Sequence, residues 1–228
     1  MSPIHQAVNY AAMPAQAAAV VELRTRDADR TQQEILRAAT DEFSERGLGG
    51  ARIDNIAERA GVNKRLIYYY FGAKDELFLA VLEQTYADIR AAERELHLET
   101  ANPADAVRRL VAFTWNHYLS HPEFLTLLNS ENLHRARHLK DSKRIREMNS
   151  PLIQTLGDVL ERGRRDGVFR GGVDAVQLYI SIAGLAYFYL SNNHTLSTIF
   201  ARDLMSPKAL SERLSHITEV VMGYVLRN

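Results

Sequence analysis

The chain has 228 residues with 28 Lys and Arg against 28 Asp and Glu, so its formal net charge is zero. This balance excludes a polycation, and any contact with nucleic acid must come from a local basic patch. The absence of cysteine excludes disulfide scaffolds, thiol catalysis and cysteine-ligated zinc. No apolar run approaches the roughly 20 residues of a membrane span. A secretory signal begins with a positively charged segment, and here no Lys or Arg precedes Glu22. We therefore expect a cytoplasmic protein with no membrane partner.

Helical periodicity runs along most of the chain, and no segment of useful length alternates apolar and polar residues, which predicts an all-α fold. The Ala-rich residues 1–26 carry little charge and are expected to form a flexible tail, with a helical turn through Ala15–Leu23 as the alternative. The first helix is expected to begin between Asp27 and Thr31, and Gly47 is expected to end it.

Two short helices and a long one follow. Gly61 ends the first, Asn63 can cap the second, and Gly72 closes it, which gives helices over residues 54–60 and 64–71 and a long helix from Lys74. Pro and Gly then punctuate five further helices, expected at about residues 104–120, 123–139, 142–166, 174–193 and 207–226. The first three helices form a small module, and the remainder is large enough to enclose a cavity.

Residues 53–67 have the pattern of a helix-turn-helix. Ala57 is small where the second helix crosses, and Gly61 suits the left-handed conformation of a tight turn. Ile56, Val62 and Ile67 supply apolar contacts between the helices. The second helix then presents side chains that can donate to phosphates and base edges, namely Asn63, Lys64, Arg65, Tyr68 and Tyr69.

The charge of this segment favours a DNA contact over a merely solvated hairpin. From Arg46 to Lys74 there are six basic residues and two acidic ones, a local excess of four positive charges in a neutral chain. Such a patch is typical of a surface that binds the phosphate backbone.

Residues about 28–80 resemble the DNA-binding domain of the TetR family of bacterial transcription regulators. The resemblance rests on the helix at 35–43 with Glu45-Arg46-Gly47, on residues 56–62, and on the aromatic, lysine and acidic signature of residues 66–77. It implies a DNA-binding domain over residues 27–87, with the helix-turn-helix at about 53–72, and a helical ligand-binding and dimerisation domain over 88–228.

The resemblance also implies a function. A homodimer would bind a pseudo-palindromic operator on double-stranded DNA as a repressor and leave it when a small-molecule effector binds. A ligand-independent DNA-binding protein and an activator of the same family remain alternatives. By the same resemblance Lys64 and Arg65 probe the major groove, while Tyr69 and Lys74 hold phosphates. Arg52 stands where the family usually has Thr or Ser, so it cannot cap the helix that follows but can reach a phosphate.

An effector pocket is expected among the aromatic residues of the C-terminal part. Trp115 and Tyr118 lie three residues apart on one expected helix, and Tyr187 lies in an aromatic cluster on another. Such side chains with a few polar groups are typical of sites for flat or partly apolar ligands. Ordinary core packing or a dimer interface is the alternative. The polar candidates for the effector site are Asn116, Glu131 and Asn132.

Glu131, His134 and His138 have metal-ligand spacing if they share one helix face. The basic residues between 135 and 146 oppose a cation, so we expect no metal and no cofactor. This basic stretch is a solvated face, a site for an anionic effector, or a secondary phosphate contact. No nucleophile, phosphate-loop or dinucleotide motif is found, so we expect no enzyme.

Overall fold

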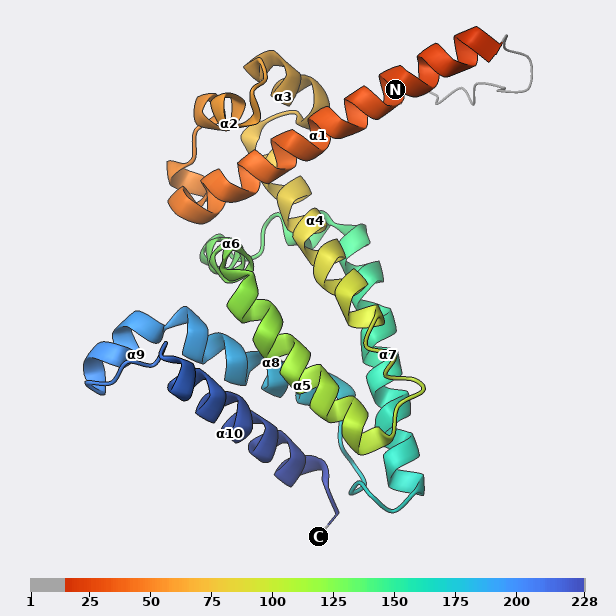
Figure 1. The fold of residues 1–228 in the computed structure, drawn as a ribbon, viewed down its shortest axis with the longest axis vertical. Coiled ribbons are helices and arrows are strands. Elements are labelled where there is room, and N and C mark those ends of the chain that lie inside the picture. The colour runs from red at the N-terminus through yellow and green to blue at the C-terminus, as the bar shows by residue number, and fades with distance from the viewer. Residues whose placement is uncertain (1–14, 228) are drawn as a thin grey trace.

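The computed structural model describes residues 15–227, and this range is helical, with no strand beyond one isolated bridge between Phe169 and Leu226 (Figure 1). The all-α prediction is confirmed. No helix in the described range is long and apolar enough to cross a membrane. The helices are α1 (Ala15–Gly50), α2 (Ile53–Ala60), α3 (Lys64–Phe71), α4 (Lys74–Arg94), α5 (Pro103–Ser120), α6 (Pro122–Leu133), the 3₁₀ turn η2 (Leu139–Asp141), α7 (Lys143–Arg165), α8 (Ala175–Ser191), α9 (Asn193–Ile199) and α10 (Pro207–Val225).

The first helix differs from its prediction at one end. Gly47, the predicted end, interrupts it with φ 64° and ψ 169°, and a short helical stretch continues to Gly50. It begins at Ala15 rather than between Asp27 and Thr31, because the alanine-rich residues 15–19 have high helix propensity. Part of the expected tail, residues 1–14, lies outside the described residues.

Helices α1 to α3 and the first half of α4 pack around one apolar core. Ile35, Phe43, Ile56 and Ile67 are fully buried in it, and the Phe43 ring meets Phe78 of α4 edge-on at 5.1 Å. The helix α4 then leaves this module and runs beside α7 (Figure 1). One helix therefore belongs to both parts of the molecule.

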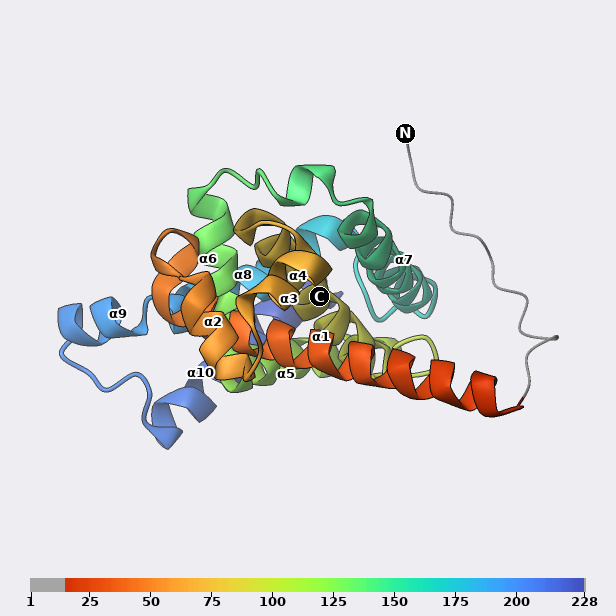
Figure 2. The same ribbon diagram turned by 90° about the horizontal axis from the view of Figure 1, so that it is seen from above.

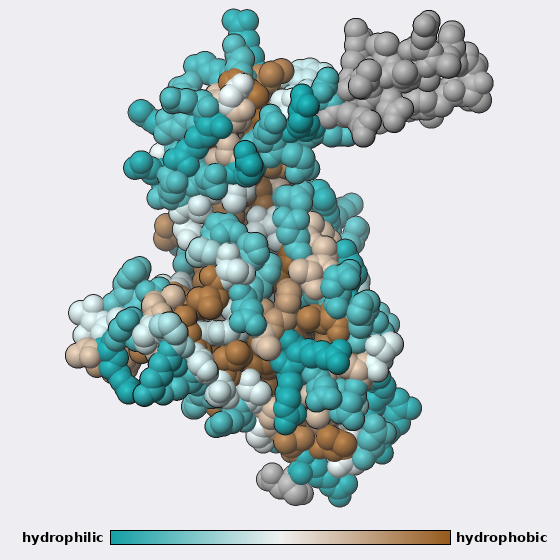
Figure 3. Space-filling view, in the orientation of Figure 1, coloured by the Kyte–Doolittle hydropathy of each residue, from teal (hydrophilic) through white to brown (hydrophobic). Residues whose placement is uncertain are grey.

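The remaining helices pack around a second core. Helix α5 lies against α7, α8 and α10, and Leu110, Trp115, Val159, Ile182 and Val221 are buried between them. Helix α9 lies on one side of the molecule, whereas the first turns of α1 extend beyond the opposite side (Figure 2). The face drawn in Figure 3 is mostly hydrophilic over the helix-turn-helix end and carries apolar side chains over the C-terminal helices.

Two of the five downstream helices differ from prediction. The one expected over 174–193 ends at Ser191, and α9 follows it as a separate helix. The one expected over 123–139 ends at Leu133, because Arg135 and Ala136 adopt left-handed φ values of 59° and 55°. The buried Glu131 carboxylate stabilises this turn by accepting the main-chain N–H groups of residues 138 and 139, at 2.9 and 3.0 Å.

Candidate functional site

The turn between α2 and α3 has the geometry that the sequence predicts. Gly61 lies in the left-handed region at φ 65°, and the Asn63 side chain accepts from the Arg65 N–H at 2.9 Å. Ile56 and Ile67 are fully buried between the helices, and Val62 is half-buried. These contacts fix the angle at which α3 leaves the domain surface.

Helix α3 presents its polar and aromatic residues to solvent. Lys64 and Arg65 are exposed, and the side chains of Tyr68 and Tyr69 are 52% and 78% exposed. Adjacent exposed aromatic groups form a patch of the kind that marks interaction sites. The Lys64 Nζ lies 2.9 Å from the Asp54 carboxylate, and this hydrogen bond raises the pKa of Lys64. The predicted DNA-contact residues of α3 thus lie together on one exposed surface.

Arg52 is the residue before α2, and its side chain makes no capping hydrogen bond. The start of α2 is held instead by Glu42, a fully buried residue of α1 that the sequence pattern does not single out. Its Oε1 accepts from the Arg52 N–H at 3.1 Å and from the Asn55 side chain at 2.9 Å, and its Oε2 lies 3.4 Å from Arg59. The signal in the sequence is an acid that follows Ile35, Ala38 and Ala39 on the apolar face of α1.

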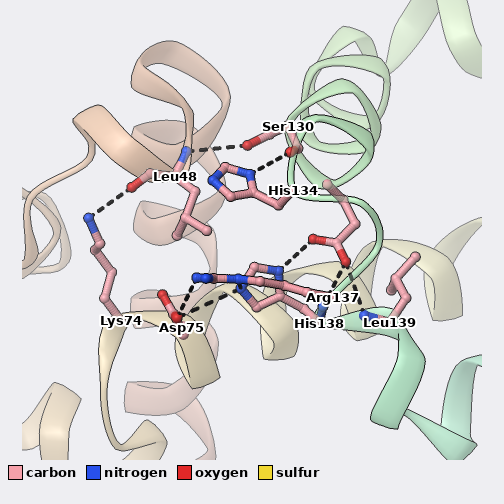
Figure 4. A network of polar contacts seen from close by, with 9 residues as sticks. Leu48, Lys74, Asp75, Ser130, His134, Arg137, His138 and Leu139 are labelled. Carbon is pink, nitrogen blue, oxygen red and sulfur yellow. Dashed lines mark hydrogen bonds and ion pairs between the residues drawn. The ribbon is translucent and has the colours of Figure 1, made fainter.

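Lys74, expected to hold a phosphate, has a partner inside the protein. Its ammonium donates to the main-chain carbonyl of Leu48 at 2.8 Å (Figure 4) and to that of Ala51 at 3.1 Å. It thereby ties the first turn of α4 to the last turn of α1 and the residue that follows it.

The next residue, Asp75, connects the same turn of α4 to the C-terminal part. The Arg137 guanidinium lies 2.6 Å from the Asp75 carboxylate, while His138 beside it is bonded to Glu131 at 2.5 Å (Figure 4). Because α6 ends at Leu133, Glu131 and His138 do not share a helix face, and the two side chains bond to each other across the turn. Within the described residues no group of three or more candidate ligands could hold a metal ion.

The six expected effector residues do not form one pocket. Trp115 and Tyr118 are 2% and 5% exposed, and their rings pack against Tyr189 and Phe124 with centroids 5.7 and 5.5 Å apart. Burial raises the pKa of Tyr118. These two residues therefore have the environment of core side chains.

The polar members of that set are separated. Asn116 and Asn132 are exposed, and the Glu131 carboxylate is occupied by the turn after α6. The Tyr187 hydroxyl donates to Asn129.

A cavity of about 320 Å³ lies instead between α4 and α7. Arg90 and Glu93 line it and are 4% and 5% exposed, with the Arg90 Nη1 2.7 Å from the Glu93 carboxylate. The Arg90 Nη2 donates to the Tyr179 hydroxyl at 2.6 Å. Burial raises the pKa of Glu93 to about 7. The sequence pattern does not single out this pair, although both residues fall on or beside the apolar face that Leu82, Tyr86 and Ile89 define.

Comparisons with known proteins agree with this architecture. A family model described as "Bacterial regulatory proteins, tetR family" matches residues 35–81, and "Tetracyclin repressor-like, C-terminal domain" matches residues 103–221. The HTH-type transcriptional repressor NicS of Pseudomonas putida is 42% identical over 200 residues, which cover 88% of this chain and 94% of NicS. The repressor SCO4008 of Streptomyces coelicolor is 37% identical over 49% of this chain and 54% of its own.

Solved structures share the fold. The ketosteroid transcriptional regulator KstR2 of Mycobacterium tuberculosis aligns with a TM-score of 0.63 and 22% identity over 86% of this chain and 95% of its own. A TetR transcription regulator from Haloarcula marismortui aligns with a TM-score of 0.65 and 18% identity over 86% and 98%. The related proteins are regulators and not enzymes, as the missing catalytic motifs predict. The chain therefore belongs to the TetR family of bacterial DNA-binding transcription regulators.

Proposed function

We propose that this protein is a repressor that binds a pseudo-palindromic operator as a homodimer and is released by a small molecule. The observation that carries the proposal is the exposed row of basic and aromatic side chains on α3, held on a rigid helix-turn-helix. The similarity to NicS, which is named as a repressor, favours repression over activation.

In this proposal Asn63, Lys64 and Arg65 enter the major groove, because they occupy the first turn of the second helix and its cap. Tyr68 and Tyr69 hold the adjacent phosphates, and Arg52 at the start of α2 reaches the backbone from the other side. Lys74 can join them without leaving its carbonyl partners, because an ammonium has three N–H donors and two of them are used.

The homodimer is supported by an apolar stripe on α8. Val176, Ile180 and Phe188 recur at helical spacing and are 44%, 55% and 58% exposed, with Gly184 between them. Val220 and Tyr224 of α10, a helix that contacts α8, are exposed to a similar degree. Exposed apolar side chains gathered on two neighbouring helices are typical of an interface.

Helix α4 supports a route from effector to DNA. Its last turns line the α4–α7 cavity, and its first turn carries Lys74 and Asp75 at the DNA-binding domain. Because Trp115 and Tyr118 are packed in the core, we assign the effector to this cavity instead. A ligand there would shift α4 and change the separation of the two recognition helices, with a coupling of about 1–3 kcal/mol.

The test is selection of the operator from random duplexes, followed by affinity measurements over a range of salt concentrations. We expect two half-sites about one helical turn apart. If each subunit neutralises about three to five phosphates, log K should fall with log[salt] with a slope of about −5 to −9. A slope near zero on the best site would overturn DNA binding. If no small molecule releases the operator, the ligand-independent alternative is favoured. If the protein increases transcription in vitro, an activator is favoured.

A further inference from the structure

We propose that the α4–α7 cavity binds a small organic carboxylate, with Arg90 and Glu93 as its anion-binding end. The inference rests on the proposed function only for its consequence, the release of DNA. The binding itself depends on side chains in the C-terminal part of the molecule.

Arg90 is the first reason for an anionic ligand. Its guanidinium is buried, and within the described part of the chain neither Nε nor Nη1 has a hydrogen-bond partner. The Nη1 is close to Glu93, but the contact is an ion pair without hydrogen-bond geometry. Buried donors are almost always satisfied in folded proteins, and a carboxylate is the acceptor that best matches the guanidinium fork. The cavity beside Arg90 has room for such a group.

Glu93 is the second reason, because its carboxyl group can be neutral and then does not repel an anionic ligand. Burial favours its neutral form, which can donate a hydrogen bond to a carboxylate. Arg90 faces Glu93 from the same helix, and the hydroxyls of Tyr118 on α5 and Tyr179 on α8 lie close to this pair. Arg94 and Glu99 line the cavity with charges of opposite sign, and the α7 residues that line it are uncharged. With Glu93 protonated, the lining therefore carries a net positive charge.

The rest of the cavity fits the apolar body of such a ligand. Leu98, Met148, Pro151 and Leu152 line it together with Thr155, and its volume of about 320 Å³ can hold one ring or a short alkyl chain. A carboxylate at Arg90 would let this body lie between α4 and α7.

The first experiment is calorimetric titration of the full-length protein, without DNA, with benzoate and hexanoate and with their uncharged amides. We expect saturable binding of at least one acid in the micromolar to low millimolar range, and at least about tenfold weaker binding of its amide. At pH values above the pKa of Glu93 in the ligand-free protein, binding of the acid requires Glu93 to take up a proton. The affinity for the acid should therefore fall by up to about tenfold per pH unit. No binding of either acid, or equal binding of acid and amide, would overturn the proposal.

Three variants assign the residues. Glu93→Gln should keep the affinity for the acid and remove its pH dependence between about pH 7 and pH 9. Arg90→Lys keeps the charge but loses the fork, and should weaken binding by about tenfold or more. Arg108→Lys, an exposed position on α5 outside the cavity lining, should change affinity less than about threefold. A loss with Arg108→Lys instead of Arg90→Lys, or pH dependence retained in Glu93→Gln, would contradict the assignment. The Gln variant keeps the test decisive if Arg90→Lys does not fold.

Operator release measured in parallel separates the two proposals. Binding of the acid without any change in operator affinity would leave the carboxylate site intact and remove the effector step from the proposed function. Release of the operator by another molecule, with no binding of either acid, would support the effector step of the proposed function and overturn the carboxylate site.

Discussion

The Lys64 ammonium on the recognition helix lies 2.9 Å from the carboxylate of Asp54 in the first turn of α2. Both side chains are exposed, at 57% and 75%, so the ion pair is open to solvent. An operator phosphate or base edge that contacts Lys64 must compete with Asp54 and must also approach the negative charge of that residue.

Asp54→Asn should therefore strengthen operator binding. An exposed ion pair contributes at most about 1 kcal/mol, so the expected gain is roughly two- to fivefold in Kd at moderate salt. Fluorescence anisotropy with labelled operator measures it. Asp158→Asn removes an exposed acid from α7, far along the chain from the helix-turn-helix, and should change nothing. Weaker binding by Asp54→Asn would show that Lys64 does not face the DNA.

Arg65→Ala should relax sequence preference at particular base pairs. The expected loss is about 1–3 kcal/mol on the best operator if Arg65 makes a bidentate guanine contact. Lys74→Ala should instead weaken binding to all sequences alike and lower the salt slope by about one unit for each phosphate lost. Competition binding with single-base operator variants distinguishes the two effects. Equal, sequence-blind losses from both variants would mean that the recognition surface lies elsewhere.

Glu42→Ala should destabilise the DNA-binding domain. Its carboxylate is fully buried and accepts from the Arg52 N–H and the Asn55 side chain, so the variant removes two hydrogen bonds from partly buried donors. We expect a loss of about 1–3 kcal/mol in the free energy of unfolding, measured by urea denaturation. Glu45→Ala is the matched control, because Glu45 also pairs with Arg59 but is exposed. Similar losses from both would contradict the role of burial.

Trp115→Ala should act on stability rather than on ligand binding. Trp115 is 2% exposed and packs edge-on against Tyr189, so truncation leaves a large void and costs about 3–5 kcal/mol. Thermal melting measures this loss, and calorimetry on the folded fraction measures carboxylate affinity. A near-native melt with lost effector response would restore Trp115 to the effector site.

Ile180→Asp should dissociate the proposed homodimer. A charge in the centre of the α8 stripe would have to be buried without a partner, and the dimer Kd should rise by about a hundredfold or more. Leu133→Asp is the matched control, because Leu133 is 82% exposed at the end of α6 and outside the α8 stripe. Sedimentation velocity distinguishes monomer from dimer. Dissociation by both variants, or by neither, would contradict the interface.

The helix-turn-helix could be predicted to within one residue, because local signals mark it. Asn63 and Gly72 stand at the two ends of α3, and Gly61 makes the turn, so the chain itself specifies where the helices begin and end. Arg52 was correctly excluded as a capping side chain. Glu42, which accepts the Arg52 N–H, comes from another helix ten residues earlier, and its one signal in the sequence is an acid on the apolar face of α1.

The less local features could not be predicted in the same way. Neither Gly nor Pro follows Leu133 for several residues, so the periodicity continues while the helix ends. The tertiary hydrogen bonds to Glu131 override the local preference there. Trp115 illustrates a second limit, because an aromatic side chain on an amphipathic helix fits a core and a pocket equally well. Arg90 and Glu93 illustrate a third limit. An Arg and a Glu three residues apart on a helix usually form an ion pair on the solvent-exposed face, so their spacing does not indicate burial.

The first turn of α4 holds two distant parts of the chain through consecutive residues. Lys74 bonds to Leu48, 26 residues before it, and Asp75 to Arg137, 62 residues after it. A domain boundary drawn through α4 therefore divides the sequence, but the bonds of Lys74 and Asp75 join the first turn of α4 to both domains. A chimera that joins this DNA-binding domain to the C-terminal domain of another family member would leave Asp75 without Arg137 unless that domain supplies an equivalent base. Substitutions at positions 75 and 137 should accordingly occur in pairs as such proteins diverge.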